Sequence, residues 1–275
     1  MTDTANADQV AYWNAGAGET WAALQAQLDR QLEPLGQRTL QALGPKPGEH
    51  ILDIGCGAGQ TTLALAQACR PGGSALGLDI SRPLLQLARE RATADVTFLE
   101  ADAQTFAFAP ASFDAAFSRF GVMFFADPAA AFANIRKGLK PGGRLAFVCW
   151  RAPAENPFMT LPMAAAAPLL PPQAPPTPGG PGPFAFADPE LVRKILAAAG
   201  FSGVEITPHD QKIGSGDLDQ AITVALRVGP LGAALREHPD KRETVIDAVR
   251  GALSAHDGPE GVKLDSASWI VTARS

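Results

Sequence analysis

The chain has 275 residues, 46% of them hydrophobic, which is enough for one large α/β domain with a substantial core and an added cap. Its 23 basic and 28 acidic residues give a net charge of -5 without long runs of one sign, so the basic footprint of a nucleic-acid-binding protein is missing. The three cysteines, Cys56, Cys69 and Cys149, have no paired spacing and predict neither a disulfide framework nor a metal cluster. We therefore expect a small-molecule substrate and a cytoplasmic location.

Signals for secretion or membrane insertion are also missing from the sequence. Residues 1–4 show no basic and apolar leader pattern, and the most apolar later segment, 161–170, is interrupted by Pro162 and Pro168. We expect no membrane association.

Near the N-terminus, an apolar stripe recurs at spacings of three and four residues. Its members are Trp21, Leu24, Leu28, Leu32 and Leu35. This spacing predicts an amphipathic helix over 19–33, which Pro34 breaks or bends.

From residue 50 onward, apolar runs of strand length alternate with helical patterns. Strands are expected at 51–55, 74–79, 96–99, 113–117 and 144–150, with helices at 60–68, 83–92 and 128–139 between them. A sixth strand is expected at 201–207 and a final one at 266–273. This alternation is typical of a parallel sheet covered by helices on both faces.

The segment after the fifth expected strand is rich in proline. Eight of the sixteen residues at 168–183 are proline, and such a segment forms neither a helix nor a central strand, so we expect a stiff cap loop. Asp188-Pro189-Glu190 then predicts a helix start, and further helices are expected around 218–228 and 240–253.

The most informative segment is the turn after the first expected strand. It reads Asp53-Ile54-Gly55-Cys56-Gly57-Ala58-Gly59. Glycines at alternate positions remove the Cβ atoms that would keep a ligand away from the backbone. The dinucleotide fingerprint has two residues before its third glycine, whereas this loop has one. A carboxylate at the strand end also suits a ligand with cationic groups, such as the sulfonium and ammonium of S-adenosylmethionine. The alternative is a tight turn that binds nothing.

Two further acids follow expected strands. Asp79 ends the second strand, 24 residues after Gly55, where a carboxylate can accept two hydrogen bonds from a ribose diol. Asp102 follows the third strand, where a carboxylate can accept from the exocyclic amine of adenine. Each has an ordinary structural explanation as well, because Asp79 or Ser81 can cap the helix that begins at Pro83 and Asp102 can form a turn.

Together with Phe113-Asp114-Ala115-Ala116-Phe117-Ser118, these segments have the order and spacing of the motifs of class I S-adenosylmethionine-dependent methyltransferases, which the chain resembles over roughly residues 10–150. The turn at 139–145 is similar to that of the small-molecule branch, which includes the quinone-biosynthesis methyltransferases. The resemblance implies an α/β, doubly wound, Rossmann-like sheet of seven mainly parallel strands with an antiparallel last strand at 266–273. It also implies an N-terminal helical lid and a cap insertion after the fifth strand.

This architecture divides the chain into four expected segments. They are a helical lid at 1–45, the cofactor-binding core at 46–150, a proline-rich cap insertion at 151–187, and the remainder of the core at 188–275 with a helical cap segment at 214–255.

The resemblance also implies which residues hold the cofactor, S-adenosylmethionine. The glycines would approach its methionine part, Asp53 would hold the polar end directly or through water, and the backbone at Ser118 would face the amino group. Asp79 would hold the ribose and Asp102 the adenine amine. The full expected set is Asp53, Gly55, Cys56, Gly57, Gly59, Asp79, Ile80, Asp102, Ala103 and Ser118.

The catalytic residues stay unassigned in the sequence. A hydroxyl acceptor calls for a general base, and His209 is the histidine that follows an expected strand end. Arg119 can pair with a substrate carboxylate or phenolate, or instead bond to carbonyls or acids of the cap. The expected substrate pocket comprises Tyr12, Trp13, Phe120, Met123, Trp150 and Asn156.

This largely apolar set favours an apolar or aromatic acceptor, with O-methylation preferred over C- or N-methylation. We expect no metal, and a homodimer stays an open alternative. Two other functions stay open as well: a non-catalytic scaffold or sensor that binds S-adenosylmethionine, and a peptide-directed methyltransferase.

Overall fold

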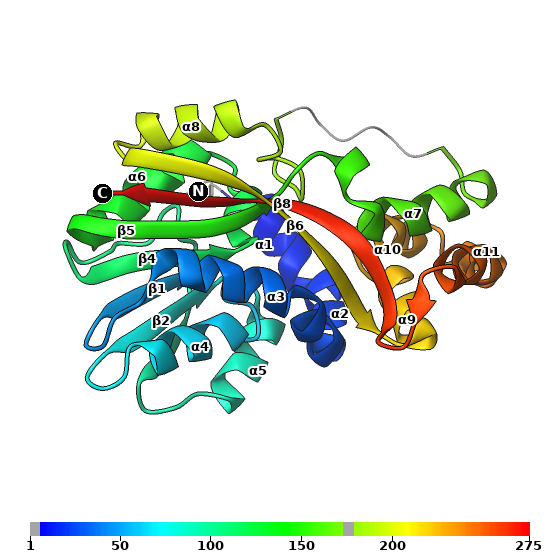
Figure 1. Ribbon diagram of the computed structural model, residues 1–275, viewed down its shortest axis with the longest axis horizontal. Helices are drawn as coiled ribbons and strands as arrows, with labels where there is room; N and C mark the ends of the chain where they lie inside the picture. The colour runs from blue at the N-terminus through cyan, green and yellow to red at the C-terminus, as the bar shows by residue number, and fades with distance from the viewer. Residues whose placement is uncertain (1–5, 173–178) are drawn as a thin grey trace.

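The structure is a computed structural model that describes residues 6–172 and 179–275. Its centre is a mixed sheet with the strand order β3-β2-β1-β4-β5-β8-β6, and a two-residue strand, β7, pairs with β8 outside this path (Figure 1). The strands are β1 (His50–Ile54), β2 (Ser74–Asp79), β3 (Val96–Glu100), β4 (Phe113–Arg119), β5 (Leu139–Trp150), β6 (Ser202–Gly216), β7 (Asp257–Gly258) and β8 (Gly261–Arg274).

The first five strands pair in parallel, and β8 is antiparallel to both of its long neighbours. The fold is therefore the expected doubly wound, Rossmann-like, mainly parallel sheet with an antiparallel last strand. Strand order reverses between β1 and β4, which is where ligands bind in such sheets, outside the carboxyl ends of the strands.

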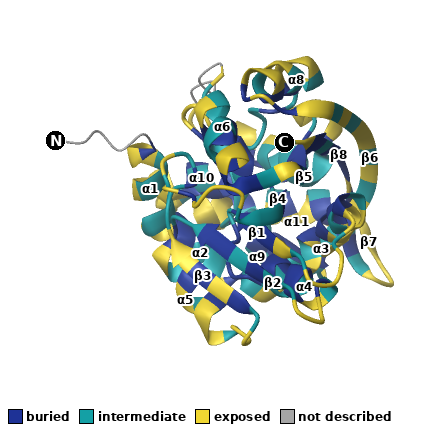
Figure 2. Cartoon of the chain, turned by 90° about the vertical axis from the view of Figure 1, so that its left-hand side faces the viewer, coloured by how far each residue is buried: buried dark blue, intermediate teal, exposed yellow. Residues whose placement is uncertain are grey.

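Helices cover both faces of this sheet. On one face lie α4 (Gln60–Ala68), α5 (Arg82–Glu90) and α3 (Gln25–Leu43), and on the other lie α6 (Pro128–Gly138) and α8 (Pro189–Ala198) (Figure 1). Apolar side chains fill the layer on each face. They include Leu65 of α4 and Phe117 of β4 in one cluster, and Phe132 of α6 and Phe147 of β5 in the other. Figure 2 shows that the central strands are buried, whereas the outer surfaces of α5, α8 and the edge strand β6 are exposed.

The N-terminal helices correct one prediction. Instead of one helix at 19–33 that ends near Pro34, the chain forms α1 (Ala7–Asn14) and α2 (Gly16–Ala23), turns at Leu24, and continues through Pro34 to the end of α3. An interior proline costs a helix about 3 kcal/mol. Burial of several apolar side chains along α3 offsets this cost. The buried apolar residues of α3 are Leu28, Leu32, Leu35 and Leu43.

The cap insertion at 151–187 contains a helix that the sequence did not predict. This helix, α7 (Pro157–Ala166), ends before the proline-rich stretch at 168–183, and one proline occupies its first turn, where a missing N–H is tolerated. Residues 173–178 of the proline-rich stretch lie outside the described residues. The sequence also missed α10 (Gly229–Glu237), which lies between α9 (Leu218–Ala225) and α11 (Arg242–Ser254).

Strand β6 extends nine residues beyond its expected end at 207, and its far half runs with β8 toward the cap helices (Figure 1). Side chains of α7, α9, α10, α11 and β8 form a separate apolar cluster there. The cap thus has a core of its own, joined to the sheet by two long strands. Within the two described ranges, no helix is both long and apolar enough to cross a bilayer.

We expect Phe147→Ala to lower the free energy of unfolding by about 3–5 kcal/mol, because it leaves a cavity against Phe132 and Phe186 in the buried core. Urea denaturation followed by circular dichroism measures this change. The matched control is Leu191→Ala, an exposed position on α8, which should change the value by no more than about 0.5 kcal/mol. Similar changes in the free energy of unfolding for the two variants would contradict the packing of Phe147 against Phe132 and Phe186.

Candidate active site

The glycine loop begins where β1 ends, at the point where strand order reverses. Gly55 and Cys56 both donate their N–H groups to the Leu78 carbonyl, at 2.8 and 3.0 Å, which ties the loop to the end of β2. At Gly55, φ is +67° and a Cβ would lie 2.7 Å from the Gly121 backbone, so no side chain fits. At Gly57, φ is +54° and a Cβ would meet no described atom beyond its chain neighbours within 4 Å. This glycine therefore leaves open space above the loop.

Gly59 corrects part of the prediction for this loop. It does not line the cavity described below. A Cβ on Gly59 would lie 2.6 Å from the Phe98 ring, and its φ is +85° at the start of α4. The third glycine is thus required by packing against β3 and by the turn into the helix, and not by close approach to a ligand.

Asp53 is fully buried beneath the loop. Its Oδ2 accepts hydrogen bonds from the hydroxyls of Thr61 (2.7 Å) and Thr62 (2.6 Å), whereas Oδ1 has no partner among the described residues. Burial raises the pKa of this carboxyl to about 6, although the two hydroxyls and the charge of Arg119 act in the opposite direction. Asp53 does not line the cavity, so any direct contact with a ligand needs a small rearrangement.

Asp79 connects the glycine loop to the end of β2. Its Oδ2 accepts from the Gly57 N–H and its Oδ1 from the Ser81 N–H, both at 2.8 Å. Burial raises the pKa of Asp79, and these backbone hydrogen bonds oppose the shift. The carboxylate lines the cavity and keeps acceptor capacity, since it offers about four lone-pair sites.

The start of α5 corrects the expected cap. The Ser81 hydroxyl does not cap this helix but donates to the Trp13 carbonyl at 2.9 Å. Asn14 supplies the cap from the N-terminal helix, because its Oδ1 accepts from the Arg82 N–H at 2.9 Å while its Nδ2 donates to the Ile80 carbonyl at 2.7 Å. The N-terminal helices are thereby fastened over the end of β2.

A second asparagine fastens the N-terminal segment at the opposite side. Asn6 donates to Asp102 Oδ2 and accepts from the Ala126 N–H, both at 2.7 Å. Neither Asn6 nor Asn14 was selected from the sequence, since asparagine near a helix end is usually an ordinary cap. Trp13 lies in the segment between these two asparagines. Its ring packs edge-on against the rings of Trp21 and Phe124, with a distance of 5.6 Å between ring centroids in both pairs.

One cavity, with a volume of about 270 Å³, runs from the glycine loop to the cap. Most of the expected cofactor residues line its first part. They are Gly55, Cys56, Gly57, Asp79, Ile80, Asp102 and Ala103. Burial raises the pKa of the Cys56 thiol well above its usual value, so this residue lines the site as a neutral group. Ser118 does not line the cavity, because its hydroxyl is buried between the Ile54 carbonyl and the Gly121 N–H.

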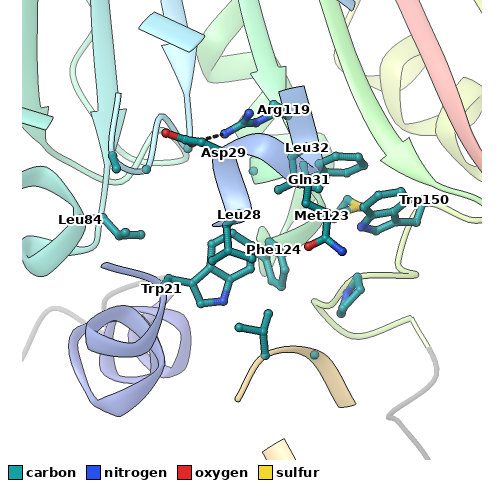
Figure 3. Close-up of a pocket in the computed structure, with 18 of the residues that line it drawn as sticks. Trp21, Leu28, Asp29, Gln31, Leu32, Leu84, Arg119, Met123, Phe124 and Trp150 are labelled. Carbon is teal, nitrogen blue, oxygen red and sulfur yellow. Dashed lines mark hydrogen bonds and ion pairs between the residues drawn. The ribbon is translucent and has the colours of Figure 1, made fainter. Parts of the chain in front are cut away.

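The second part of the cavity is an apolar chamber (Figure 3). Of the expected pocket residues, Trp13, Phe120, Met123 and Trp150 line the cavity, and the Phe120 and Trp150 rings stack 3.9 Å apart. The sequence missed further chamber residues on α2, α3 and the cap, because helical stripes look alike whether they face a core or a cavity. These residues are Trp21, Leu28, Gln31, Leu32, Val224, Leu231 and Leu264.

Two expected pocket residues do not line the cavity. Tyr12 is 44% exposed, and its hydroxyl accepts from Arg236 at 3.0 Å on the outer surface. Asn156 is buried but anchors the polypeptide backbone, since its Oδ1 accepts from the Ala267 N–H at 2.9 Å and its Nδ2 donates to the carbonyls of Arg151 and Ala152. Both are therefore structural contacts.

The two catalytic candidates differ in position. His209 lies on β6 outside the cavity, where burial and the charge of Arg38 lower its pKa. Arg119 lines the cavity, but its guanidinium donates to Gln60 and, at 3.4 Å, to Asp29 of α3. Arg119 thus bonds to an acid of the N-terminal helices, and nothing in the geometry gives His209 the role of a base.

Comparison with known proteins supports the motif-based resemblance. A family model described as a methyltransferase domain matches residues 52–147. A demethylmenaquinone methyltransferase of Thermus thermophilus is 34% identical over 168 residues, which cover 57% of this chain and 76% of that protein. Nocamycin O-methyltransferase of Saccharothrix syringae is 27% identical over 238 residues, 81% of this chain and 84% of that protein. The chain belongs to the class I S-adenosylmethionine-dependent methyltransferases.

Within this family, the protein falls in the branch of the quinone-biosynthesis methyltransferases. Solved structures agree on the fold. The YcgJ protein from Bacillus subtilis superposes with a TM-score of 0.58 at 17% identity, over 88% of this chain and 98% of that one. Phosphoethanolamine N-methyltransferase 2 of Haemonchus contortus, solved with S-adenosylmethionine, superposes with a TM-score of 0.52 at 19% identity, over 88% of this chain and 52% of that one. The protein is a methyltransferase whose cofactor is S-adenosylmethionine.

The residues present fit this cofactor. The open space at Gly57 and the inward-facing carboxylate of Asp79 form a cradle at the strand ends. Beneath it lies the unpaired Oδ1 of Asp53, whose negative charge suits a ligand with two cationic groups. In the described part of the chain, no group of three or more His, Cys, Asp or Glu side chains is placed to hold a metal ion.

The stability of the methyltransferase should depend on the ionisation of Asp53. Because burial raises its pKa from 3.8 to about 6 on folding, the folded state binds a proton more tightly than the unfolded state. This contribution to stability is present below about pH 4 and is lost as the pH rises to about 6–7. Asparagine does not ionise, so the free energy of unfolding of Asp53→Asn should not fall for this reason between about pH 4 and pH 7. In urea denaturation over this pH range, the variant should therefore gain stability relative to wild type as the pH rises.

The control is Asp247→Asn, an exposed position on α11, which should keep the wild-type pH profile. Parallel profiles for wild type and Asp53→Asn would show that Asp53 does not change its proton affinity on folding.

Proposed function

We propose that this methyltransferase methylates a small, apolar or aromatic acceptor on an oxygen atom. The observation that carries the proposal is the continuity of the cavity, which joins the cradle at the strand ends to an apolar chamber. An acceptor in this chamber lies beside the cofactor site, between apolar side chains that shield it from part of the bulk water. Displacement at a sulfonium methyl depends mainly on alignment and desolvation, and this arrangement supplies both.

The cofactor end is held by residues of the first four strands. S-adenosylmethionine supplies an electrophilic methyl group on its sulfonium. In our proposal Asp79 accepts from the ribose hydroxyls, Ile80 packs on the adenine, and Asp102 accepts from the adenine amine. Asp102 has room for this role, because its carboxylate accepts two hydrogen bonds, from Asn6 and from the Gln104 N–H, and keeps further lone-pair positions.

The acceptor end is formed mostly by aromatic and aliphatic side chains. Trp21 and Phe124 lie on one side of the chamber, and Met123 and Trp150 lie on the other (Figure 3). Flat apolar walls of this kind favour an aromatic ring, because stacked and edge-on ring contacts add to the gain from burial.

Two relatives that are named as O-methyltransferases support oxygen as the methylated atom. Nocamycin O-methyltransferase aligns over 81% of this chain. An O-methyltransferase of Pyrenophora dematioidea is 33% identical over 151 residues, which cover 53% of this chain and 54% of that protein. The demethylmenaquinone methyltransferase makes a quinol-like ring a reasonable first acceptor to test.

Calorimetric titration tests the cofactor site. Wild type should bind S-adenosylmethionine and S-adenosylhomocysteine but not NAD. Asp79→Ala should bind both more weakly by at least about tenfold, because it removes a charge-assisted hydrogen-bond acceptor and frees the glycine loop. The exposed-site control, Asp247→Ala, should bind like wild type. Tight NAD binding without binding of S-adenosylmethionine would overturn the assignment.

A methyl-release assay over phenols, quinols, carboxylates, amines and short peptides tests the acceptor. We expect turnover with phenols or quinols. Ala225→Trp should raise KM for the acceptor by about tenfold or more without changing the affinity for S-adenosylhomocysteine, because the larger side chain fills the chamber. Ala255→Trp, an exposed position after α11, is the size-matched control. Turnover of peptides alone would favour the peptide-directed alternative.

A further inference from the structure

One polar side chain of the lid helix α3 points into the apolar chamber. Figure 3 shows the carboxamide of Gln31 directed into the space between Phe124 and Trp150. Across the described ranges, the carboxamide of the Gln31 side chain makes no hydrogen bond with another residue. This distinguishes it from Gln25 and Asp29, which line the same cavity from the same helix and bond to each other.

A second polar side chain without a partner comes from the cap end of the sheet. Ser215 of β6 is only 3% exposed and lines the cavity. Its hydroxyl makes no hydrogen bond within the part of the chain that the structure describes. The neighbouring positions that line the cavity are Ile213, Val262 and Leu264, all of them apolar.

Gln31 is half-buried, and neither its carboxamide nor the Ser215 hydroxyl is a fully buried group without a partner, so both groups are open to the cavity. An apolar residue at position 31 would instead extend the buried stripe of α3. A site that offers such polar groups to a ligand favours molecules with a matching polar group over analogues that lack it.

We propose that Gln31 determines acceptor specificity by hydrogen bonding to an oxygen substituent of the acceptor, with Ser215 as a further contact. The proposal rests on the proposed function and names its acceptor class: an aromatic molecule that carries a hydroxyl or carbonyl group. A carboxamide both donates and accepts, so it can bond to a hydroxyl, a phenolate or a carbonyl. Gln31 orients the acceptor in this scheme and transfers no proton.

Equilibrium dialysis of the protein loaded with S-adenosylhomocysteine against 2-naphthol or naphthalene tests the role of Gln31. Wild type should bind 2-naphthol about tenfold more tightly than naphthalene. Gln31→Leu should bring this ratio to about one without weakening the binding of naphthalene, and Ser215→Ala should lower it less. The matched control is Gln37→Leu, which makes the same change on the exposed side of α3 and should keep the wild-type ratio. Unchanged affinity for S-adenosylhomocysteine shows that each variant is folded.

The outcomes separate this inference from the proposed function. If wild type binds neither compound, the aromatic acceptor and the role of Gln31 both fail. If wild type binds the two equally, or if Gln31→Leu keeps the preference for 2-naphthol, only the role of Gln31 fails. Loss of the preference in Gln31→Leu together with its retention in Gln37→Leu supports the proposal.

Discussion

The site depends on hydrogen bonds that hold the glycine loop against the end of β2. Gly55 and Cys56 donate to the Leu78 carbonyl, and Gly57 donates to the Asp79 carboxylate. These bonds fix the loop in one arrangement of left-handed conformations, which its glycines adopt without steric cost. With the loop in place, backbone and carboxylate together form one wall of the cavity. The cofactor site is therefore a consequence of how two parallel strands end side by side.

The opposite wall comes from segments distant in the sequence. Asn6 and Asn14 fasten the N-terminal helices to the loops after β3 and β2, and the long strands β6 and β8 carry the cap helices to the far end of the chamber. In the N-terminal helices, the hydrogen bonds of Asn6 and Asn14 lie on either side of the aromatic packing of Trp13. This arrangement encloses the chamber without a continuous covering domain.

Sequence patterns predicted the part of the fold in which local periodicity and burial agree. The five parallel strands and α4 follow from alternating patterns and from the motif order. The cap was harder, because proline at a first helical turn looks the same in sequence as proline in a loop, and α7 begins with one. The predicted site residues also divide into those that local sequence patterns place correctly beside the cavity and those that they do not. Asp79 and Asp102, which were selected from their places at strand ends, line the cavity. Tyr12 and Asn156 do not, because a side chain's direction depends on tertiary packing.

The chain separates the two halves of its site. The segment that matches the family model, 52–147, supplies the cofactor end, whereas α3 and the cap, which lie outside it, supply most of the acceptor chamber. Helix α3 touches both halves, because Asp29 bonds to Arg119 near the cofactor end and Gln31, two residues later, faces the chamber. Both side chains move with one helix, so a shift of α3 that changes one contact also changes the other. In our proposal for Gln31, acceptor recognition and the cofactor end of the site are coupled through this single helix.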